Sequence, residues 1–344
     1  MGTIIALLIN MKNKTLSHFK SFFRSINLKT LFVLLGFVWV PTLYNSCAGY
    51  EANQEILKSV DLDTNQVNEP NNDASDTTDA TNDQTPDNNE FDSSNDGWLI
   101  VQDYNNGAVG EKAQFDAGGA SRYSDEVSLE GGQSCQMGIN AGATGFGQWG
   151  GVISHPETLY EGDELWFRVY TYFPEGFDYF SYGEGGRLKF LRMHVENSQG
   201  DNRGYNDIYI DGKNASSAFK FIYEGEQRWV NLGEKSLLPK FNQWESYEFY
   251  VKFHHKSKDD GGEAVIRFWK NGELIKEITN RKTLVDPTDS SDRTHIFTYW
   301  NGGSPKTQFM YIDNLVLTSK TPPDMDEFGN PYVGTGIYQQ EATQ

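Results

Sequence analysis

The chain has little cysteine and no long hydrophobic segment. Only Cys47 and Cys135 occur among 344 residues, so no disulfide framework, zinc-site spacing or thiol active site is indicated. We expect Cys135 to be packed as a small apolar group. The P-loop, Gly-x-Ser-x-Gly and His-Glu-x-x-His motifs are also missing. Their absence removes the nucleotide, serine-hydrolase and zinc-protease classes that these motifs mark.

Acidic residues are absent before Glu51, and five bases are present there. An apolar run at residues 31–40 follows, too short to span a bilayer comfortably and typical of an export signal. The segment ending at Ser46-Cys47 resembles a bacterial lipoprotein signal, which implies lipidation of Cys47 and a membrane anchor. An ordinary cleaved signal and an uncleaved anchor are the alternatives. We therefore predict an export segment at residues 1–47, and a membrane-anchored (periplasmic or cell-surface) or secreted protein.

Apolar residues are scarce from Glu51 to Asp96, where thirteen acids stand against the single base Lys58. Such a segment cannot bury enough surface to offset chain entropy. We predict a disordered acidic tether at residues 48–97. The remaining domain, residues 98–344, keeps a net charge of −12, which argues against a nucleic-acid partner. A local basic groove can still bind an anionic polymer, because charges are screened beyond roughly 8 Å.

Convincing helices are missing, and apolar and polar residues alternate with a period of two. Leu165, Phe167 and Val169 alternate with Trp166 and Arg168, so this strand has one buried face and one aromatic, cationic face. Asn271-Gly272 predicts a hairpin turn. We predict an all-β fold, a two-sheet antiparallel β-sandwich. Strands are expected near residues 98–102, 112–116, 133–139, 150–154, 163–173, 187–195, 205–211, 217–223, 244–255, 263–270, 273–279, 293–300 and 308–318.

Four segments, at residues 128–137, 164–174, 244–273 and 311–317, resemble concanavalin A-like jelly rolls. This group includes polysaccharide lyases of the heparin lyase I and glucuronan lyase kind, laminarinase-like hydrolases and non-catalytic lectin domains. The resemblance implies the fold and leaves the activity open. The Glu-x-Asp-x-x-Glu run that places two carboxylates in a laminarinase-type cleft is missing, so a paired-acid hydrolase is disfavoured.

Four groups that can be cationic lie within eight residues: Arg187, Lys189, Arg192 and His194. If side chains alternate regularly along residues 187–195, both faces of the strand carry apolar as well as charged residues. Either a groove meets the strand or a bulge changes the facing part way along it. We interpret the cluster as a binding site for a polymer's carboxylates. Ordinary ion pairs with neighbours such as Glu175 and Asp178 are the alternative.

Three further groups have a functional and an ordinary interpretation. Tyr250, Lys252 and His254 share a strand face suited to proton abstraction, although a solvated outer face is favoured. Tyr299 and Trp300 form either a stacking platform or part of the core. Asp313 with the loop acids Asp259, Asp260 and Glu263 would make a calcium site, but scattered acids are usually solvated. No cofactor is expected otherwise.

We predict a polysaccharide lyase that cleaves a uronic-acid polymer by β-elimination. Arg187, Lys189 or Arg192 would neutralise the carboxylate, His194 would be the base, and Tyr170 or Tyr209 would protonate the leaving oxygen. Trp166, Arg168, Lys252 and Tyr299 would bind substrate, in one continuous cleft with the basic cluster. The alternative is a non-catalytic carbohydrate-binding module of a surface lipoprotein, and a third class is a structural or adhesion lipoprotein.

Overall fold

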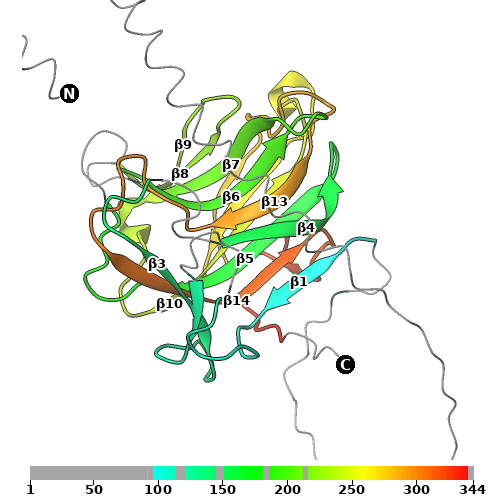
Figure 1. The fold of residues 1–344 in the computed structure, drawn as a ribbon. Helices are drawn as coiled ribbons and strands as arrows, with labels where there is room; N and C mark the ends of the chain where they lie inside the picture. The colour runs from blue at the N-terminus through cyan, green and yellow to red at the C-terminus, as the bar shows by residue number, and fades with distance from the viewer. Residues whose placement is uncertain are drawn as a thin grey trace, which may run out of the picture. The chain divides into compact units, whose positions relative to one another are not determined.

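The computed structural model describes residues 91, 96–113, 121–144, 151–180, 186–211 and 216–339. They form two antiparallel sheets packed face to face, which confirms the predicted β-sandwich (Figure 1). Helical structure in these residues consists of the short 3-10 turns Lys235–Leu237 and Lys258–Asp260. The predicted export segment, with Cys47, and nearly all of the predicted tether lie outside the described residues. No helix within the described ranges is long and apolar enough to cross a membrane.

The eight-stranded sheet has the order β12-β11-β10-β5-β14-β3-β2, and β1 also pairs with β14. Its strands are β1 (Leu99–Gln102), β2 (Ser121–Ser124), β3 (Ser134–Ile139), β5 (Glu164–Tyr172), β10 (Trp244–Lys252), β11 (Val265–Lys270), β12 (Glu273–Ile278) and β14 (Gln308–Thr318). The β11–β12 hairpin turns through Asn271 and Gly272, with φ of 51° and 81°. Both residues adopt the left-handed backbone conformation, as the tight hairpin turn predicted from Asn-Gly requires.

The six-stranded sheet has the order β4-β13-β6-β7-β8-β9. Its strands are β4 (Gly151–Leu159), β6 (Leu188–Glu196), β7 (Asn202–Ile210), β8 (Ser217–Tyr223), β9 (Val230–Glu234) and β13 (Ser291–Ile296). A separate short pair, β15 (Asp324–Met325) and β16 (Pro331–Tyr332), lies near the C-terminus. Most predicted strands are present. The expected strand at 112–116 is wrong for Lys112 and Ala113, of which Lys112 makes only an isolated bridge to Arg122. The strands β2, β9, β15 and β16 were not predicted.

The main core lies between the two sheets. It contains Leu165, Phe167 and Val169 from β5, as the alternation predicted, together with Cys135 from β3 and Phe249 from β10. All five side chains are fully buried. The side of each sheet that faces away from this core is its outer face, and the two outer faces lie on opposite sides of the sandwich.

A β-bulge in β6 decides which side chains reach the outer face of the six-stranded sheet. Lys189 pairs with Tyr209, but the next pair along the strand is Leu191 with Ile208, so Phe190 is the extra residue. Phe190 and Leu191 consequently both point into the core. The alternation resumes one residue later, so Lys189 and Arg192 share the outer face. The bulge considered from the sequence is thus present.

The C-terminal segment covers part of the outer face of the eight-stranded sheet. Its Val333 and Tyr338 pack with Trp166, Tyr250 and Trp269 in a second hydrophobic cluster. Phe91 also joins this cluster, where its ring lies 5.6 Å from that of Tyr338. The predicted tether therefore does not stay solvated to its end, because Phe91 offers an apolar side chain that the C-terminal segment contacts.

Candidate functional site

Cross-strand pairing on the six-stranded sheet aligns polar side chains in rows. Lys189 of β6 pairs with Tyr209 of β7, which in turn pairs with Lys220 of β8. In the next row Arg192 pairs with Asp207. Paired residues of neighbouring strands present their side chains on the same side, so these groups meet on the outer face. We call this surface the polar face, and it comprises Lys189, Arg192, His194, Tyr205, Asp207, Tyr209, Lys220, Glu224, His295 and Tyr299.

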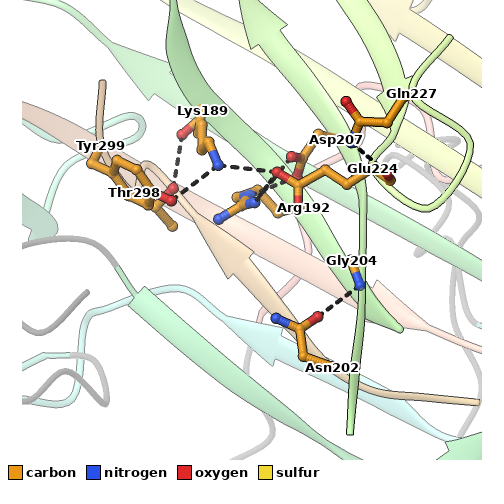
Figure 2. A network of polar contacts seen from close by, with 9 residues as sticks. All are labelled: Lys189, Arg192, Asn202, Gly204, Asp207, Glu224, Gln227, Thr298 and Tyr299. Carbon is orange, nitrogen blue, oxygen red and sulfur yellow. Dashed lines mark hydrogen bonds and ion pairs between the residues drawn. The ribbon is translucent and has the colours of Figure 1, made fainter. Parts of the chain in front are cut away.

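Two cations and two carboxylates form an ion-pair quartet at the centre of the polar face (Figure 2). Arg192 binds Asp207 through two nitrogens, at 2.6 and 3.0 Å. Glu224 Oε1 accepts from Lys189 Nζ at 3.0 Å and from Arg192 at 3.1 Å. Lys189 Nζ also lies 3.0 Å from the hydroxyl of Tyr299. A carboxylate between Lys189 and Arg192 is therefore already satisfied by two charge-assisted hydrogen bonds.

The pKa values of the two carboxylates in the quartet are shifted in opposite directions. Burial raises the pKa of Asp207 to about 6, even though Arg192 lies beside it. Burial would also raise the pKa of Glu224, but the charges of Arg192 and Lys189 outweigh this effect and lower it. The quartet is neutral when both carboxylates are ionised. As the pH falls through about 6, Asp207 takes up a proton, and the quartet then carries one net positive charge.

Aromatic rings surround the cations. The Arg192 guanidinium carbon lies 3.8 Å from the centre of the Tyr205 ring, and Lys189 Nζ lies 4.6 Å from that of Tyr299. Both distances are typical of cation–π contacts. Burial raises the pKa of Tyr209 well above its usual value, so this phenol stays protonated near neutral pH.

His194 is held at both ring nitrogens. Its Nδ1 lies 2.7 Å from an oxygen of Asp292, and its Nε2 lies 3.3 Å from Arg293. Because arginine only donates, Nε2 must accept and Nδ1 must carry the proton toward Asp292. His194 is also only 1% exposed. A base role would require Arg293 to release Nε2.

Two other histidines border His194 and add no positive charge near neutral pH. Burial lowers the pKa of His155 to about 4, and it lowers the pKa of His295 well below its usual value. His155 contacts Thr294 and the carbonyl of Ser291. The positive charge near the polar face therefore comes from lysine and arginine.

A second ion-pair group lies next to the polar face. Asp211 is 1% exposed and binds Arg187 Nε at 2.7 Å and Lys220 Nζ at 3.2 Å. Arg187 also lies 4.8 Å from the centre of the Trp229 ring. The partner of Arg187 is thus Asp211. Of the acids considered from the sequence, the Glu175 carboxylate accepts from Asn242 and the Asp178 carboxylate accepts from the backbone N–H of Phe180.

The prediction of one continuous cleft is wrong. Trp166, Arg168 and Tyr170 of β5 point to the outer face of the eight-stranded sheet, and the hydrophobic core separates that face from the polar face. Arg168 is fully buried there, donating to the carbonyls of Asn314 and Gly336. The Tyr170 hydroxyl donates to the carbonyl of Thr335. Tyr170 therefore cannot act together with His194.

Lys252 and Trp300 also lie away from the polar face. Lys252 belongs to β10 in the eight-stranded sheet and binds Glu263 at 2.8 Å. Trp300 is fully buried in the main core, which agrees with the ordinary interpretation of this residue. Of the predicted site residues, the structure brings together Arg187, Lys189, Arg192, His194, Tyr209 and Tyr299.

The acids of the suggested calcium site do not converge. Asp313 pairs with Tyr170 near one end of β5. Glu263 binds Lys252, and Lys252 pairs with Glu164 at the other end of β5. Six residues of strand separate these positions, or about 20 Å. Both oxygens of Asp313 also accept backbone N–H groups, from Leu129 and Asn314.

Two other groups of potential metal ligands occur in the described part of the chain, and each has a competing donor. In Glu161, His254 and His255, the Nδ1 of His254 accepts from the backbone N–H of Lys256. Its Nε2 must then carry the proton, so it cannot bind a metal. In His194, Glu196 and Asp292, the Arg293 guanidinium occupies Nε2 of His194.

Several residues of the site were not predicted from the sequence. Tyr205 and Asp207 alternate with Tyr209 along β7, so the period of two could have placed all three on one face. Glu224 lies in the turn after β8, and no local pattern signals its contact with β6. Arg187 and Asp211 lie one position beyond the pair Leu188–Ile210, so their contact depends on the register between β6 and β7, which no local pattern gives.

Comparisons with family models and with curated proteins gave no match. Among solved structures, the chain is similar to the alginate lyase Aly36B, with 16% identity and a TM-score of 0.46 over 64% of this chain and 96% of that one. It is similar to an endo-β-1,4-glucuronan lyase from the fungus Trichoderma reesei, with 13% identity and a TM-score of 0.43 over 69% and 98% of the two chains. It is also similar to an alginate lyase from Aplysia kurodai, with 12% identity and a TM-score of 0.42 over 58% and 87%. These neighbours are polysaccharide lyases. At such identities the similarity does not identify acting residues.

Proposed function

We propose that the domain is a polysaccharide lyase that cleaves a uronic-acid polymer by β-elimination on the polar face. The observation that carries the proposal is the position of Glu224, whose carboxylate binds Lys189 and Arg192 together. A sugar carboxylate has the same charge and donor requirement. When it displaces Glu224, the two cations neutralise it and so stabilise the negative charge that develops when the neighbouring C–H bond ionises.

Tyr299 is the proposed proton-transfer residue, because its hydroxyl lies 3.0 Å from Lys189 Nζ. In the proposed step, the phenolate oxygen of Tyr299, stabilised by the Lys189 ammonium, takes the C5 proton of the sugar. The C–H electrons form the C4–C5 double bond, and the C4–O4 bond breaks. The phenol then returns the proton to O4. His194, the base predicted from the sequence, remains the alternative for the first transfer.

The experiment is an assay for unsaturated uronate ends, read by absorbance, on alginate, glucuronan, pectin and heparin-type polymers. Lys189→Met should lower turnover at least a hundredfold, the size expected for loss of a charge that stabilises the transition state. Lys252→Met removes an equal charge from the opposite side of the sandwich and should leave turnover unchanged. Absence of cleavage of any polymer by the wild-type domain would refute the lyase.

A non-catalytic carbohydrate-binding module is the second candidate. It is favoured by the engagement of both His194 nitrogens with Asp292 and Arg293, which leaves that imidazole without an available lone pair. In that case the polymers bind without being cleaved, and Lys189→Met weakens binding. Equilibrium binding measured beside the cleavage assay separates the two candidates.

The proposed setting is extracytoplasmic, with the chain anchored through a lipid on Cys47. Stable attachment of such a protein depends on acyl chains buried in the bilayer. Cys47→Ser should therefore move the protein from the membrane to the soluble fraction. If the variant stays with the membrane, the apolar run at residues 31–40 is an uncleaved anchor.

A further inference from the structure

An exposed tryptophan stands beside the polar face, at the start of the last strand of the six-stranded sheet. Trp229 directly precedes β9 and is 42% exposed. Its ring is fixed in place, because the Tyr209 ring meets it edge-on at 5.1 Å and the Arg187 guanidinium stacks at 4.8 Å. A large ring that is held rigidly and left open to solvent is suited to stacking on a ligand, since little conformational freedom is lost on binding.

The two cations beside Trp229 are also fixed. Asp211, which is 1% exposed, binds Arg187 and Lys220, and Ser217 donates to the same carboxylate at 3.3 Å. One buried anion thus holds two cations, and the group carries one net positive charge. The side chains of Arg187 and Lys220 are 30% and 18% exposed. The contact of Arg187 with Asp211 uses Nε, so the terminal nitrogens suit a ligand carboxylate.

The register connects this group with the quartet. Lys189, Tyr209 and Lys220 are successive cross-strand neighbours on β6, β7 and β8, and Lys220 pairs with Asn231 on β9. Neighbouring strands lie about 4.8 Å apart, so β9 is about 14 Å from β6. A polymer that crosses the strands from β6 to β9 can therefore contact both groups.

We propose that Trp229, Arg187 and Lys220 form a second uronate-binding subsite, which holds a different sugar unit from the one at Lys189 and Arg192. The pyranose stacks on the exposed Trp229 ring, and its carboxylate binds Arg187 and Lys220. The chain of the polymer then runs across the strands, from Tyr299 toward β9. This inference rests on the proposed function, because it assumes that the quartet binds a uronate.

The test measures binding of uronate oligosaccharides of increasing length, from a disaccharide to a long oligomer, to the purified chain. Trp229→Ala should weaken binding of the long oligomers by roughly threefold to tenfold, the size of one aromatic contact, and leave the disaccharide unaffected. Phe309→Ala is the matched control, because Phe309 is equally exposed, at 42%, but lies on β14 of the other sheet. It should change nothing at any length.

A second variant separates charge from stacking. Lys220→Gln keeps a long polar side chain and should weaken only the long oligomers, with a smaller effect at high salt. Trp229→Phe should retain most of the affinity. Thermal melting of each variant shows that it is folded. Equal losses at all lengths, or no loss, with Trp229→Ala would overturn the subsite while leaving the quartet intact. If the wild-type chain binds none of the oligosaccharides, the proposed function is overturned, and the subsite with it.

Discussion

Lys189 and Arg192 lie three positions apart on one strand, yet both bind the same oxygen of Glu224, at 3.0 and 3.1 Å. In a regular strand two such residues point to opposite faces. Phe190 is the extra residue that brings them together. The charge pair that defines the polar face is therefore a product of backbone irregularity.

The identity of the proton-transfer residue can be decided by two variants. Tyr299→Phe removes the hydroxyl beside Lys189 and should lower kcat about a hundredfold or more, with little change in binding. His194→Gln should cost much less if His194 is only held in place by Asp292 and Arg293. The measurement is kcat and KM against pH. A larger loss for His194→Gln than for Tyr299→Phe would assign the base to His194.

Binding of an anionic polymer should strengthen as the pH falls through about 6, where Asp207 becomes protonated. Protonation leaves the quartet one positive charge in excess, which is worth roughly 1.5-fold to fivefold in affinity toward a ligand carboxylate that solvent still screens. Asp207→Asn should remove this dependence. Calorimetry at constant ionic strength checks it, and an unchanged pH profile in the variant would contradict the role of Asp207.

The stability of the domain should fall as the pH rises from about 5 to 8. Burial raises the pKa of Glu248 to about 7, above the value of about 4.3 for an unfolded chain. Its stabilising contribution is therefore complete below that lower value and is lost as the pH rises through about 7. Burial also raises the pKa of Asp313, to about 6, which acts in the same direction.

The matched variants are Glu248→Gln and Glu273→Gln, the second being exposed on β12. The first should flatten the melting temperature across pH 5 to 8, and the second should leave the fall in place. Glu248 accepts from the backbone N–H groups of Val333 and Gly334, so the first variant should also melt at a lower temperature at pH 5. An undiminished fall in Glu248→Gln would assign the titration to other groups.

The predicted tether should be removable up to Phe91 and no further. Deleting residues 51–90 should leave the melting temperature unchanged, because this segment has almost no apolar surface to pack. Phe91→Ala in the shortened chain should lower it by about 2–4 °C, corresponding to roughly 1 kcal/mol. A large drop from the deletion alone would show that more of the segment docks on the domain.

Much of the fold could be predicted from the sequence, because the period of two is a local property. The inward side of β5 and the Asn271-Gly272 turn are correct for this reason. The aromatic and cationic side chains on the outer side of β5 were predicted correctly, but their contact with the basic cluster was not. Arg168 instead donates to the carbonyl of Gly336, 168 residues away in the chain. Glu224 was missed for the same reason. Contacts between distant segments leave no periodic trace.

The bulge at Phe190 also sets how easily the site is lost by mutation. Removing the codon for Phe190 would restore regular alternation and, with the register beyond it unchanged, would leave the core with one large side chain fewer. If the strand slid instead to refill that space, Arg192 and His194 would turn inward, where unpaired charge is not tolerated. The first outcome keeps Lys189 and Arg192 on the outer face but weakens the core, whereas the second ends their shared contact with one carboxylate. Lineages that keep this chemistry are therefore expected to keep the length of β6 more strictly than its composition.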